Sequence, residues 1–291
     1  AYRDTGAANG GPSNDAQYKE YCDRRILARI HRSTIGRLRQ EVEPVPPAAF
    51  LRFLLRWQHA APGTQLTGEE GLLEVIEQLQ GFEAAAAAWE EQLFPARVTD
   101  YAPGMLDALC FTGEVVWGRF ARRVGAEPPE EPQATPALSR LGPIAFGLRQ
   151  ELPWLLDDPA LAARPELLGL AQEVMDYLAA HGASFAPEIA AGLHRLPSEV
   201  DAALWRLVWA GLATADGAGP LRGLTSGLAK RLARASRYRR SPLARSHASR
   251  WALLRAPAPE EDTLAARAGQ LLRRYGVVTR ELVAREPMAP P

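Results

Sequence analysis

The spacing of apolar and polar residues along the first part of the chain predicts helices with few strands between them. Five segments carry apolar residues at helical spacing or a run of alanines, and several of them end at proline or glycine. They cover residues 18–42, 47–59, 68–80, 84–93 and 105–111. The residues that follow, EVVWGRF, alternate between apolar and polar side chains, which predicts a strand. A helix, a turn and a strand in this order form the closing half of a winged helix.

The same pattern returns more fully further along, where it predicts a second winged helix. After a strand and a turn in ALSRLGPIAFGLRQELPWLL, the three helices are LLGLAQEVMDYLAAHG, APEIAAGLHR and SEVDAALWRLVWAGL. Ser198 is placed to cap the third helix, because its hydroxyl can accept a hydrogen bond from a free amide of the first turn. The segments ASF, LATADG and SRWALL supply the strands and the start of the wing.

These elements predict a mainly α fold with short β strands, built from tandem winged-helix-like modules. The tail EEDTLAARAGQLLRRYGVVTREL repeats a helix, a strand and the start of a helix, which predicts a truncated further module. The proline- and acid-rich segment EPPEEPQATP is the clearest internal boundary. The predicted division is a flexible leader at 1–17, an accessory domain at 18–125, a linker at 126–136, a winged-helix domain with a basic wing at 137–255, and the truncated module at 256–291.

The overall charge excludes a global attraction to nucleic acid. Lys and Arg together number 34, as do Asp and Glu, so the chain of 291 residues has no net charge and any nucleic-acid site must be a local basic patch. The two cysteines, Cys22 and Cys110, cannot form a zinc site on their own. The chain contains no apolar run of about 18 residues, so we expect no membrane span. The polar leader lacks the apolar core of a signal peptide, so we expect a cytoplasmic protein.

The strongest local basic pattern lies in the first predicted helix. Arg25, Arg29, Arg32 and Arg39 fall at helical offsets 0, 4, 7 and 14, which places them on one narrow stripe. Apolar residues occupy most of the remaining surface of this helix. A helix that buries one side and lines the other with arginine suits a phosphate backbone. The alternative is an ordinary solvated cationic face.

The second predicted helix raises the question of what Trp57 does. It belongs to an apolar stripe at helical offsets 0, 3, 4 and 7, made of Phe50, Phe53, Leu54 and Trp57. The spacing alone favours a buried core residue. A tryptophan at the end of a helix can also stack on a base, which is worth roughly 1–3 kcal/mol and tolerates any base. Arg56, with Arg52 and His59, lies on the opposite stripe and could follow phosphates beside it.

Several stretches of the chain resemble the Lhr (large helicase-related) family of DNA helicases. They are CDRRILARIHRSTIGRLRQEVEPV, FLRFLLRWQHAAPGTQLTGEEGLLEVIEQLQGFEAAAAAWE, LFPARV and LDALCFTGEVVWGRF. In that family two ATPase domains precede a winged helix and an accessory domain that holds the tracking DNA strand. The resemblance implies that this chain is an accessory region C-terminal to the motor. It also implies that Trp57 stacks on the tracking strand and that Arg97 makes a secondary contact.

The partners implied by this resemblance are single-stranded DNA, duplex junctions and the motor domains of the same parent chain, in DNA repair. The chain contains no GxxxxGK[ST] motif, so ATP and Mg²⁺ are expected in motor domains outside it. No cofactor or metal is expected in the chain itself. In the second winged helix only Arg206 of the third helix could contact a base edge, which argues against base-specific recognition.

Two alternatives belong to other functional classes. The stretch from LQGFEAAAAAWE to PARVTDYAPGMLDAL also resembles winged-helix DNA glycosylases, more weakly than it resembles Lhr. Their short polar motif falls on Glu83-Ala84-Ala85, where alanine replaces the second polar group, and Gln78 and Gln80 are out of register with it. A glycosylase without its water-positioning group should be feeble. The other alternative is a structural or homo-oligomerising role for stacked winged helices.

Overall fold

The computed structural model describes residues 23–41, 44–120, 142–157, 167–224, 249–259 and 262–286. The chain divides into two compact units, Ala1–Leu51 and Arg52–Pro291. The first unit contains α1 (Arg24–Glu41) and the beginning of α2 (Pro47–Trp57). Asp23 caps α1, because its Oδ1 accepts hydrogen bonds from the backbone N–H groups of Arg25 (2.7 Å) and Ile26 (3.3 Å). Both helices end near the predicted positions.

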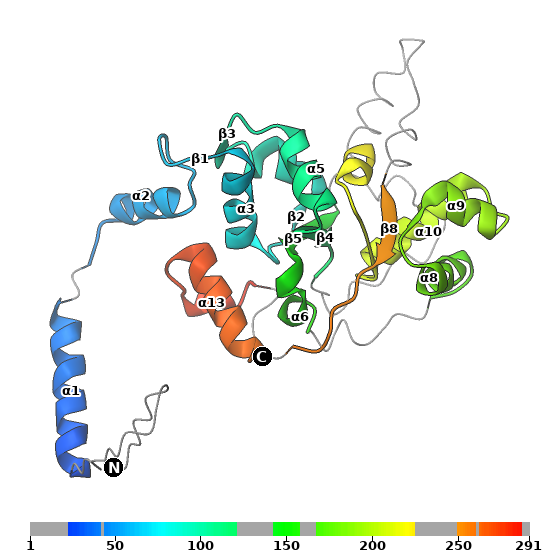
Figure 1. Cartoon of the computed structure of the whole chain (residues 1–291). Helices are drawn as coiled ribbons and strands as arrows, with labels where there is room; N and C mark the ends of the chain where they lie inside the picture. The colour runs from blue at the N-terminus through cyan, green and yellow to red at the C-terminus, as the bar shows by residue number, and fades with distance from the viewer. Residues whose placement is uncertain are drawn as a thin grey trace, which may run out of the picture. The chain divides into compact units, whose positions relative to one another are not determined.

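The second unit begins with a complete winged-helix arrangement, which we call module 1 (Figure 1). Its helices are α3 (Gly68–Leu79), α4 (Ala86–Ala88) with a π-helical turn at Trp89–Leu93, and α5 (Pro103–Phe111). Its strands are β2 (Ala84–Ala85), β4 (Val115–Gly118) and β5 (Pro143–Leu148), in the antiparallel order β2-β5-β4. A short parallel pair, β1 (Leu66–Thr67) and β3 (Val98–Thr99), lies outside this sheet.

Module 2 repeats the same order of elements. Its helices are α8 (Leu170–His181), α9 (Ala186–Gly192) and α10 (Pro197–Trp209). Its strands are β6 (Ser184–Phe185), β7 (Ala213–Ala215) and β8 (Arg250–Leu253), in the antiparallel order β6-β8-β7. The two sheets therefore have equivalent strand orders. The predicted fold class, mainly α with short strands in tandem winged-helix modules, is confirmed.

The segment predicted as a linker occupies a different place in this topology. Residues 121–141, which include 126–136, lie outside the described residues, but the strands that flank them are antiparallel neighbours. Val115 lies opposite Leu148 and Gly118 lies opposite Ala145. The segment therefore connects two strands of one sheet, and the predicted boundary between 136 and 137 cuts module 1. Proline and acidic residues indicate an exposed connection. A wing and a linker are both exposed connections, so composition alone does not distinguish them.

Two local predictions also differ from the structure. The alanine run was predicted to be helical from its first residue, but Ala84 and Ala85 form β2, since they pair with Ile144 and Pro143 of β5. The third helix of module 2 begins at Pro197, so Ser198 lies within the first turn. The N-cap is Leu196, whose backbone N–H donates to Oε2 of Glu199 (3.1 Å).

The two modules share one hydrophobic core. Trp117 of β4 lies 6.1 Å from both Trp205 of α10 and Trp251 of β8, measured between ring centroids. Its Nε1 donates to the backbone oxygen of Gly217 (3.1 Å), and Thr214 Oγ1 donates to the backbone oxygen of Trp117 (2.7 Å). Three tryptophans and two cross-module hydrogen bonds therefore join the modules.

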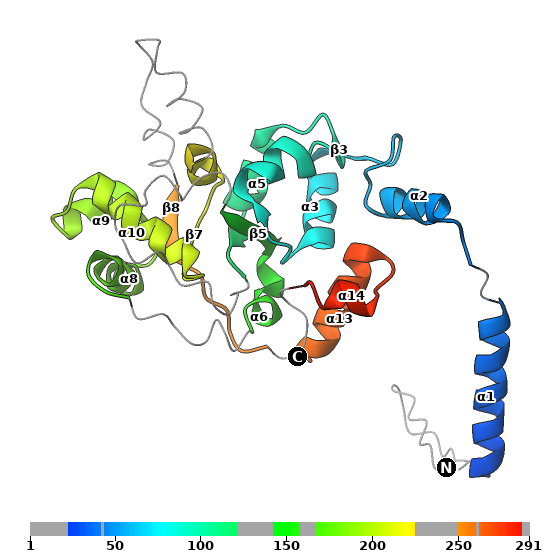
Figure 2. The same ribbon diagram turned by 180° about the vertical axis from the view of Figure 1, so that it is seen from behind.

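Two short elements follow β5: a 3₁₀ turn at Arg149–Glu151 and α6 (Leu152–Leu155). The last two helices of the described residues are α13 (Thr263–Tyr275) and α14 (Arg280–Val283). Helix α13 contacts α3 and α6, as Figures 1 and 2 show from two sides. The side chain of Gln270 donates to the backbone oxygen of Gln78 (2.9 Å), and Arg274 Nη2 donates to that of Gln80 (2.6 Å). The segment predicted to start a further module thus packs against module 1.

Candidate nucleic-acid interface

The α1 arginine stripe, defined as Arg25, Arg29, Arg32 and Arg39, is exposed along its whole length. Arg25, Arg29 and Arg32 line one surface together with Ile26 and Ser33. Among the described residues no ion pair is recorded for these four arginines. Carboxylates at helical spacing can pair with arginines on a helix, but α1 has no acid in its first turn, and its one acid, Glu41, is its last residue. The stripe can therefore offer four positive charges to a polyanion.

The rest of α1 differs from the expectation of a buried apolar side. Ile26 is 46 % exposed, Leu27 44 % and Ile30 54 %. These three apolar side chains are therefore largely exposed to solvent.

Trp57 belongs to the second unit and is neither fully buried nor free. Its side chain is 40 % exposed, and its Nε1 donates to the backbone oxygen of Arg273 in α13 (2.8 Å). Gln78 Nε2 donates to the backbone oxygen of Trp57 (2.7 Å), and the ring of Phe53 lies 5.8 Å away, centroid to centroid. The indole therefore has one edge tied to α13 and part of its surface open to solvent.

Arg97 is held by partners inside the protein. Its Nη2 donates to Oε1 of Gln58 (3.0 Å) and its Nη1 donates to the backbone oxygen of Leu93 (3.1 Å). Burial lowers the pKa of Arg97 from its usual value. Gln58 also donates to the backbone oxygen of Arg274, so one glutamine connects Arg97 to the end of α13. Arg56, in contrast, is exposed on the last turn of α2.

The structure thus separates the predicted contact residues into two groups. The α1 stripe lies in one unit, and Arg56, Trp57 and Arg97 lie in the other. The second group is organised by Gln58, Gln78 and the carbonyl groups of α13, which the sequence does not single out. Glutamines in helices and turns are common, and their partners here are up to 216 positions away, so no local signal could have identified them.

The third helices of the two modules, where winged helices commonly contact DNA, differ in what surrounds them. Asp107 of α5 accepts from the backbone N–H of Ala218 (3.2 Å) and from Arg222 Nη1 (2.6 Å), so module 2 covers part of α5. On α10, the single cationic side chain is Arg206, which is exposed. Neither helix presents a row of donors for base edges.

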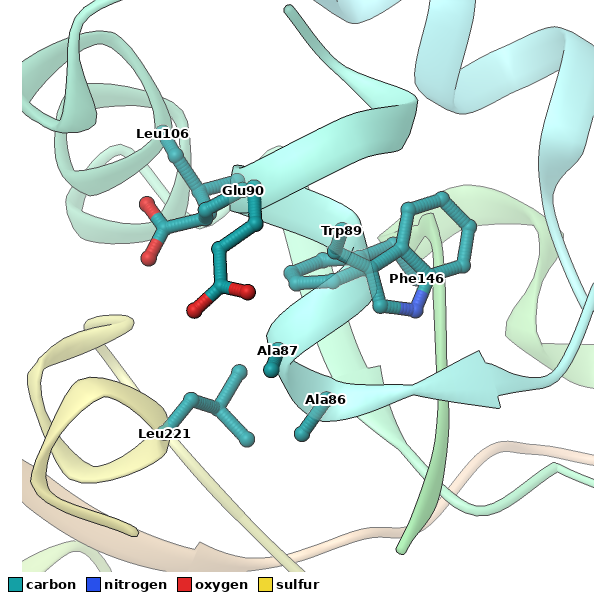
Figure 3. A pocket seen from close by; sticks show the side chains of 8 residues that line it. Ala86, Ala87, Trp89, Glu90, Leu106, Phe146 and Leu221 are labelled. Carbon is teal, nitrogen blue, oxygen red and sulfur yellow. The ribbon is translucent and has the colours of Figure 1, made fainter. Parts of the chain in front are cut away.

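A small cavity of about 100 Å³ lies beside α5 in module 1 (Figure 3). Its lining is aromatic and aliphatic, with two carboxylates, and consists of Ala86, Ala87, Trp89, Glu90, Glu91, Leu106, Phe146 and Leu221. In Figure 3 the Glu90 carboxylate lies between the two aromatic rings and Leu221.

The Glu90 carboxylate already has partners. Arg222 contacts it with Nε (2.8 Å) and Nη2 (2.9 Å), and the hydroxyl of Tyr101 donates to it (2.7 Å). Burial lowers the pKa of Arg222, but hydrogen bonds to Glu90 and Asp107 outweigh that effect and raise it above the usual value. Burial, followed by the charge of Glu90, raises the pKa of Tyr101.

The polar side chains at and near the glycosylase-like motif are buried, and they contact other side chains of the protein. The Glu83 side chain is 5 % exposed and its Oε1 lies 3.8 Å from Arg119 Nε. Gln80 is 1 % exposed and donates to Oε1 of Gln270 (3.0 Å), while Gln78 is 7 % exposed. Among the described residues no group of His, Cys, Asp and Glu side chains could hold a metal ion. None of the described helices is long and apolar enough to cross a membrane.

Comparison with known proteins agrees with the winged-helix fold and with the motif resemblance. Residues 45–131 match the family model described as "Large helicase-related protein, winged-helix domain". The protein named "Lhr helicase/ probable uracil glycosylase" from Mycolicibacterium smegmatis is 34 % identical over 290 aligned residues, which cover 94 % of this chain. The chain is therefore similar to Lhr proteins over nearly its whole length.

A second Lhr relative shows the same relation. The "Lhr helicase/uracil glycosylase" of Escherichia coli strain K12 is 31 % identical over 305 aligned residues, which cover 90 % of this chain. The alignment spans 18 % of each of these two proteins. The predicted resemblance to Lhr proteins is confirmed, and it extends over nearly the whole chain.

Proposed function

We propose that this chain is a DNA-binding accessory region of an ATP-dependent Lhr-type helicase in the cytoplasm. It grips the tracking single strand, next to duplex junctions, and couples movement of the motor to unwinding in DNA repair. ATP and Mg²⁺ act in the motor domains of the parent protein, which are the partners of this region. The observation that carries the proposal is the α1 arginine stripe, whose exposed side chains have no recorded ion pair among the described residues.

The physical basis of the grip is electrostatic. Each phosphate that a cation neutralises releases counterions, so affinity falls with the logarithm of the salt concentration. A helix with arginines at offsets 0, 4 and 7 spaces its charges along one line, as a strand backbone requires. Because the chain has no net charge, this electrostatic attraction can arise only at the α1 arginine stripe and at other basic segments.

Trp57 would act as a second, weaker contact. Its open surface could stack on a base, while the hydrogen bond from Nε1 to Arg273 holds the indole in one orientation. Arg56 lies one residue away and could contact the adjacent phosphate. The guanidinium of Arg97 already has partners inside the protein, one of which is Gln58. Arg97 would therefore act on the DNA only as a secondary contact, through Gln58.

The first experiment is fluorescence anisotropy of a labelled single-stranded DNA titrated with the chain at several salt concentrations. Replacing Arg29 and Arg32 by alanine should lower the slope of log affinity against log salt by about 1.4. The charge-matched control is Arg280→Ala/Arg285→Ala, at exposed positions in α14 and shortly after it, which should leave the slope unchanged. If both variants lowered the slope equally, the α1 arginine stripe would have no specific role, and binding would depend only on non-specific charge.

Trp57→Ala should weaken binding roughly fivefold or more at every salt concentration without changing the slope, as expected for loss of stacking. Trp57→Phe keeps an aromatic face and should retain much of the affinity. Unchanged affinity in Trp57→Ala would remove this residue from the strand contact.

A second candidate, base excision, is favoured by the names of the two relatives and by the cavity beside Glu90. It requires the Glu90 carboxylate to act on a base or on water, although Arg222 and Tyr101 already bind it. The test is incubation of the chain with a single-stranded oligonucleotide that contains one uracil, followed by alkaline cleavage. Strand cleavage that disappears in Glu90→Gln would establish this function. No cleavage above background is the outcome expected from the occupied carboxylate.

A further inference from the structure

The C-terminal end of α13 receives hydrogen bonds from side chains far away in the sequence. The last four C=O groups of an α-helix have no donor within the helix. In α13 these groups include the carbonyls of Arg273 and Arg274. Trp57 Nε1 donates to the first of these two carbonyls (2.8 Å), and Gln58 Nε2 donates to the second. The chain at the end of α2 therefore completes the hydrogen bonding of α13.

Two of the predicted DNA contacts meet at these carbonyls. Trp57 bonds directly to the carbonyl of Arg273. Arg97 reaches the carbonyl of Arg274 through Gln58, whose Oε1 accepts a hydrogen bond from Arg97 Nη2 (3.0 Å). Trp57 and Arg97 are distant in the sequence, but consecutive carbonyls of one helix end hold them at neighbouring positions.

Gln78 of α3 bonds to the same place from the interior of the protein. Its Nε2 donates to the backbone oxygen of Trp57 (2.7 Å) and lies 3.4 Å from that of Arg273. The side chain is buried, and its Oε1 has no hydrogen-bond partner among the described residues. Burying an amide with an unmatched acceptor costs free energy that an apolar residue of similar size would avoid. Packing alone therefore does not explain a glutamine at this position, whereas its donor contacts do.

The helix that receives Trp57 is itself fixed on module 1. Gln270 in the middle of α13 is buried, donates to the backbone oxygen of Gln78 (2.9 Å) and accepts from Gln80 Nε2 (3.0 Å). At the other end of α13, the hydroxyl of Thr263 donates to the carboxylate of Asp157 (2.7 Å), which follows α6. The carbonyl that bonds to the indole therefore belongs to a helix that is anchored along its length.

We propose that Gln78 is a positioning residue for Trp57: together with the carbonyl of Arg273, it holds the indole in the orientation that stacks on a base of the single strand. This inference rests on the strand contact proposed above for Trp57. The two bonds fix the backbone of Trp57 and one edge of its ring, and part of the ring stays open to solvent. A ring that is already ordered loses less freedom on binding, which raises the affinity. Because Gln78 is buried, it acts on the strand only through Trp57.

The first test observes the indole directly, without DNA. The chain is labelled with 5-fluorotryptophan, and the fluorine NMR signal of Trp57 is identified by its absence in Trp57→Phe. Gln78→Met keeps the length of the side chain and removes the donor, so the Trp57 signal should shift and broaden. The signals of Trp117 and Trp251, which lie in the shared core, should not move and serve as the internal control. A Trp57 signal with the wild-type position and width in Gln78→Met would overturn the proposal.

The second test measures whether Gln78 acts on DNA through Trp57. Gln78→Met should lower the affinity for single-stranded DNA about threefold at every salt concentration, because one more side chain must then be ordered on binding. In the Trp57→Ala background the same substitution should cause no further loss. The matched control is Gln172→Met on α8, where the lost amide donates to Asp176 of the same helix (2.8 Å), and it should leave the affinity unchanged. A full loss in the Trp57→Ala background would mean that Gln78 acts through another residue, and the proposal would be wrong.

Failure of the strand contact and failure of the positioning role give different results. If Trp57→Ala leaves DNA affinity unchanged, the stacking contact is wrong, and the fluorine signal still decides whether Gln78 orders the ring. If Gln78→Met does not fold, as judged by circular dichroism, Gln78→Asn takes its place, because its shorter side chain keeps an amide but cannot keep the 2.7 Å bond to Trp57. An unchanged Trp57 signal in Gln78→Asn would then overturn the proposal.

Discussion

The two winged-helix modules have the same order of helices and the same strand order, but their third helices have different neighbours. Helix α5 of module 1 bonds to module 2 through Asp107, and α3 of the same module is covered by α13. Helix α10 of module 2 packs on α8 and on the tryptophans of the shared core, and exposes Arg206. Module 1 therefore contacts both module 2 and α13, whereas module 2 contacts module 1.

The difference shows that topology alone does not make a DNA-reading surface. A winged helix contacts bases when the exposed side of its third helix carries donors and acceptors. Here that side is partly covered by a neighbouring module in one case and carries one arginine in the other. A row of four arginines for which the described residues supply no ion pair lies instead on α1, outside both modules.

The largest effect is expected from the contact that holds α5 to module 2. Arg222→Ala leaves Glu90 and Asp107 close together without their cation, which should lower the free energy of unfolding by about 3 kcal/mol. The three side chains are 20–27 % exposed, so solvent keeps the loss at the lower end of the range for buried pairs. Urea unfolding followed by circular dichroism measures it.

Arg250→Ala is the control for Arg222→Ala. Arg250 pairs with Asp216 (2.8 Å) within module 2, and its side chain is 56 % exposed. Its loss should cost under about 1 kcal/mol, as for a surface ion pair. If both substitutions cost the same, the contact between the modules is no stronger than an ordinary surface pair.

The packing of α13 against α2 can be tested with the glycines that follow α13 and α8, Gly276 and Gly182. An added Cβ at Gly276 would lie 2.8 Å from Phe53 and 3.0 Å from Trp57, whereas one at Gly182 would meet nothing within 4 Å. Both glycines have positive φ, so alanine is strained at either site. Only at Gly276 does the added Cβ meet side chains of α2, and this close contact should cost about a further 1–2 kcal/mol. Equal losses, measured by urea unfolding, would show that α2 does not pack against the end of α13.

A smaller effect follows from the buried thiol on α5. Burial, then the charge of Asp107, raises the pKa of Cys110 from 9.0 to about 12. The folded state therefore keeps its proton where the unfolded state loses it, so stability is intact below pH 9 and falls as the pH rises toward 12. Between pH 9 and 10 this group should account for about 1 kcal/mol of the decline.

Cys110→Ala provides the measurement for that prediction. The variant can be less stable at neutral pH, so the quantity compared is the change in unfolding free energy between pH 9 and 10. A shallower decline than in the wild type is expected. Tyr275, whose pKa burial and Glu286 raise to about 12, remains in both proteins and serves as the common background. Identical declines would show that the thiol is accessible when folded.

The smallest effect is expected on α10. Arg206→Ala should change the affinity for single-stranded DNA by less than about twofold, because one isolated arginine gives little of the electrostatic term. It is compared with Arg29→Ala/Arg32→Ala under the same salt conditions. If Arg206→Ala lowered the affinity as much as the double variant does, α10 would also contact DNA. Binding would then not be confined to α1.

Local patterns predicted much of this protein. The starts of α2 at Pro47 and α3 at Gly68, and the helix–strand–helix order of module 2, follow from periodicity, proline and glycine. The arginine stripe is also local, since helical spacing alone places its members on one face. The pairing of β2 with β5 could not be predicted, because its partners lie almost sixty positions apart and β2 has two residues.

The sequence by itself determined the resemblance to Lhr proteins, the mainly helical class, the tandem winged helices and the charge stripe of α1. These properties depend on residues near one another in the chain, whose spacing sets both the secondary structure and the face on which each side chain lies. Only the tertiary structure decided that α13 bonds to Trp57 and Gln78, that Arg97 points inward, and that 126–136 connects two strands of one sheet. An apolar or polar face can be covered by any distant segment of suitable shape, so which face is buried is a property of the packed chain.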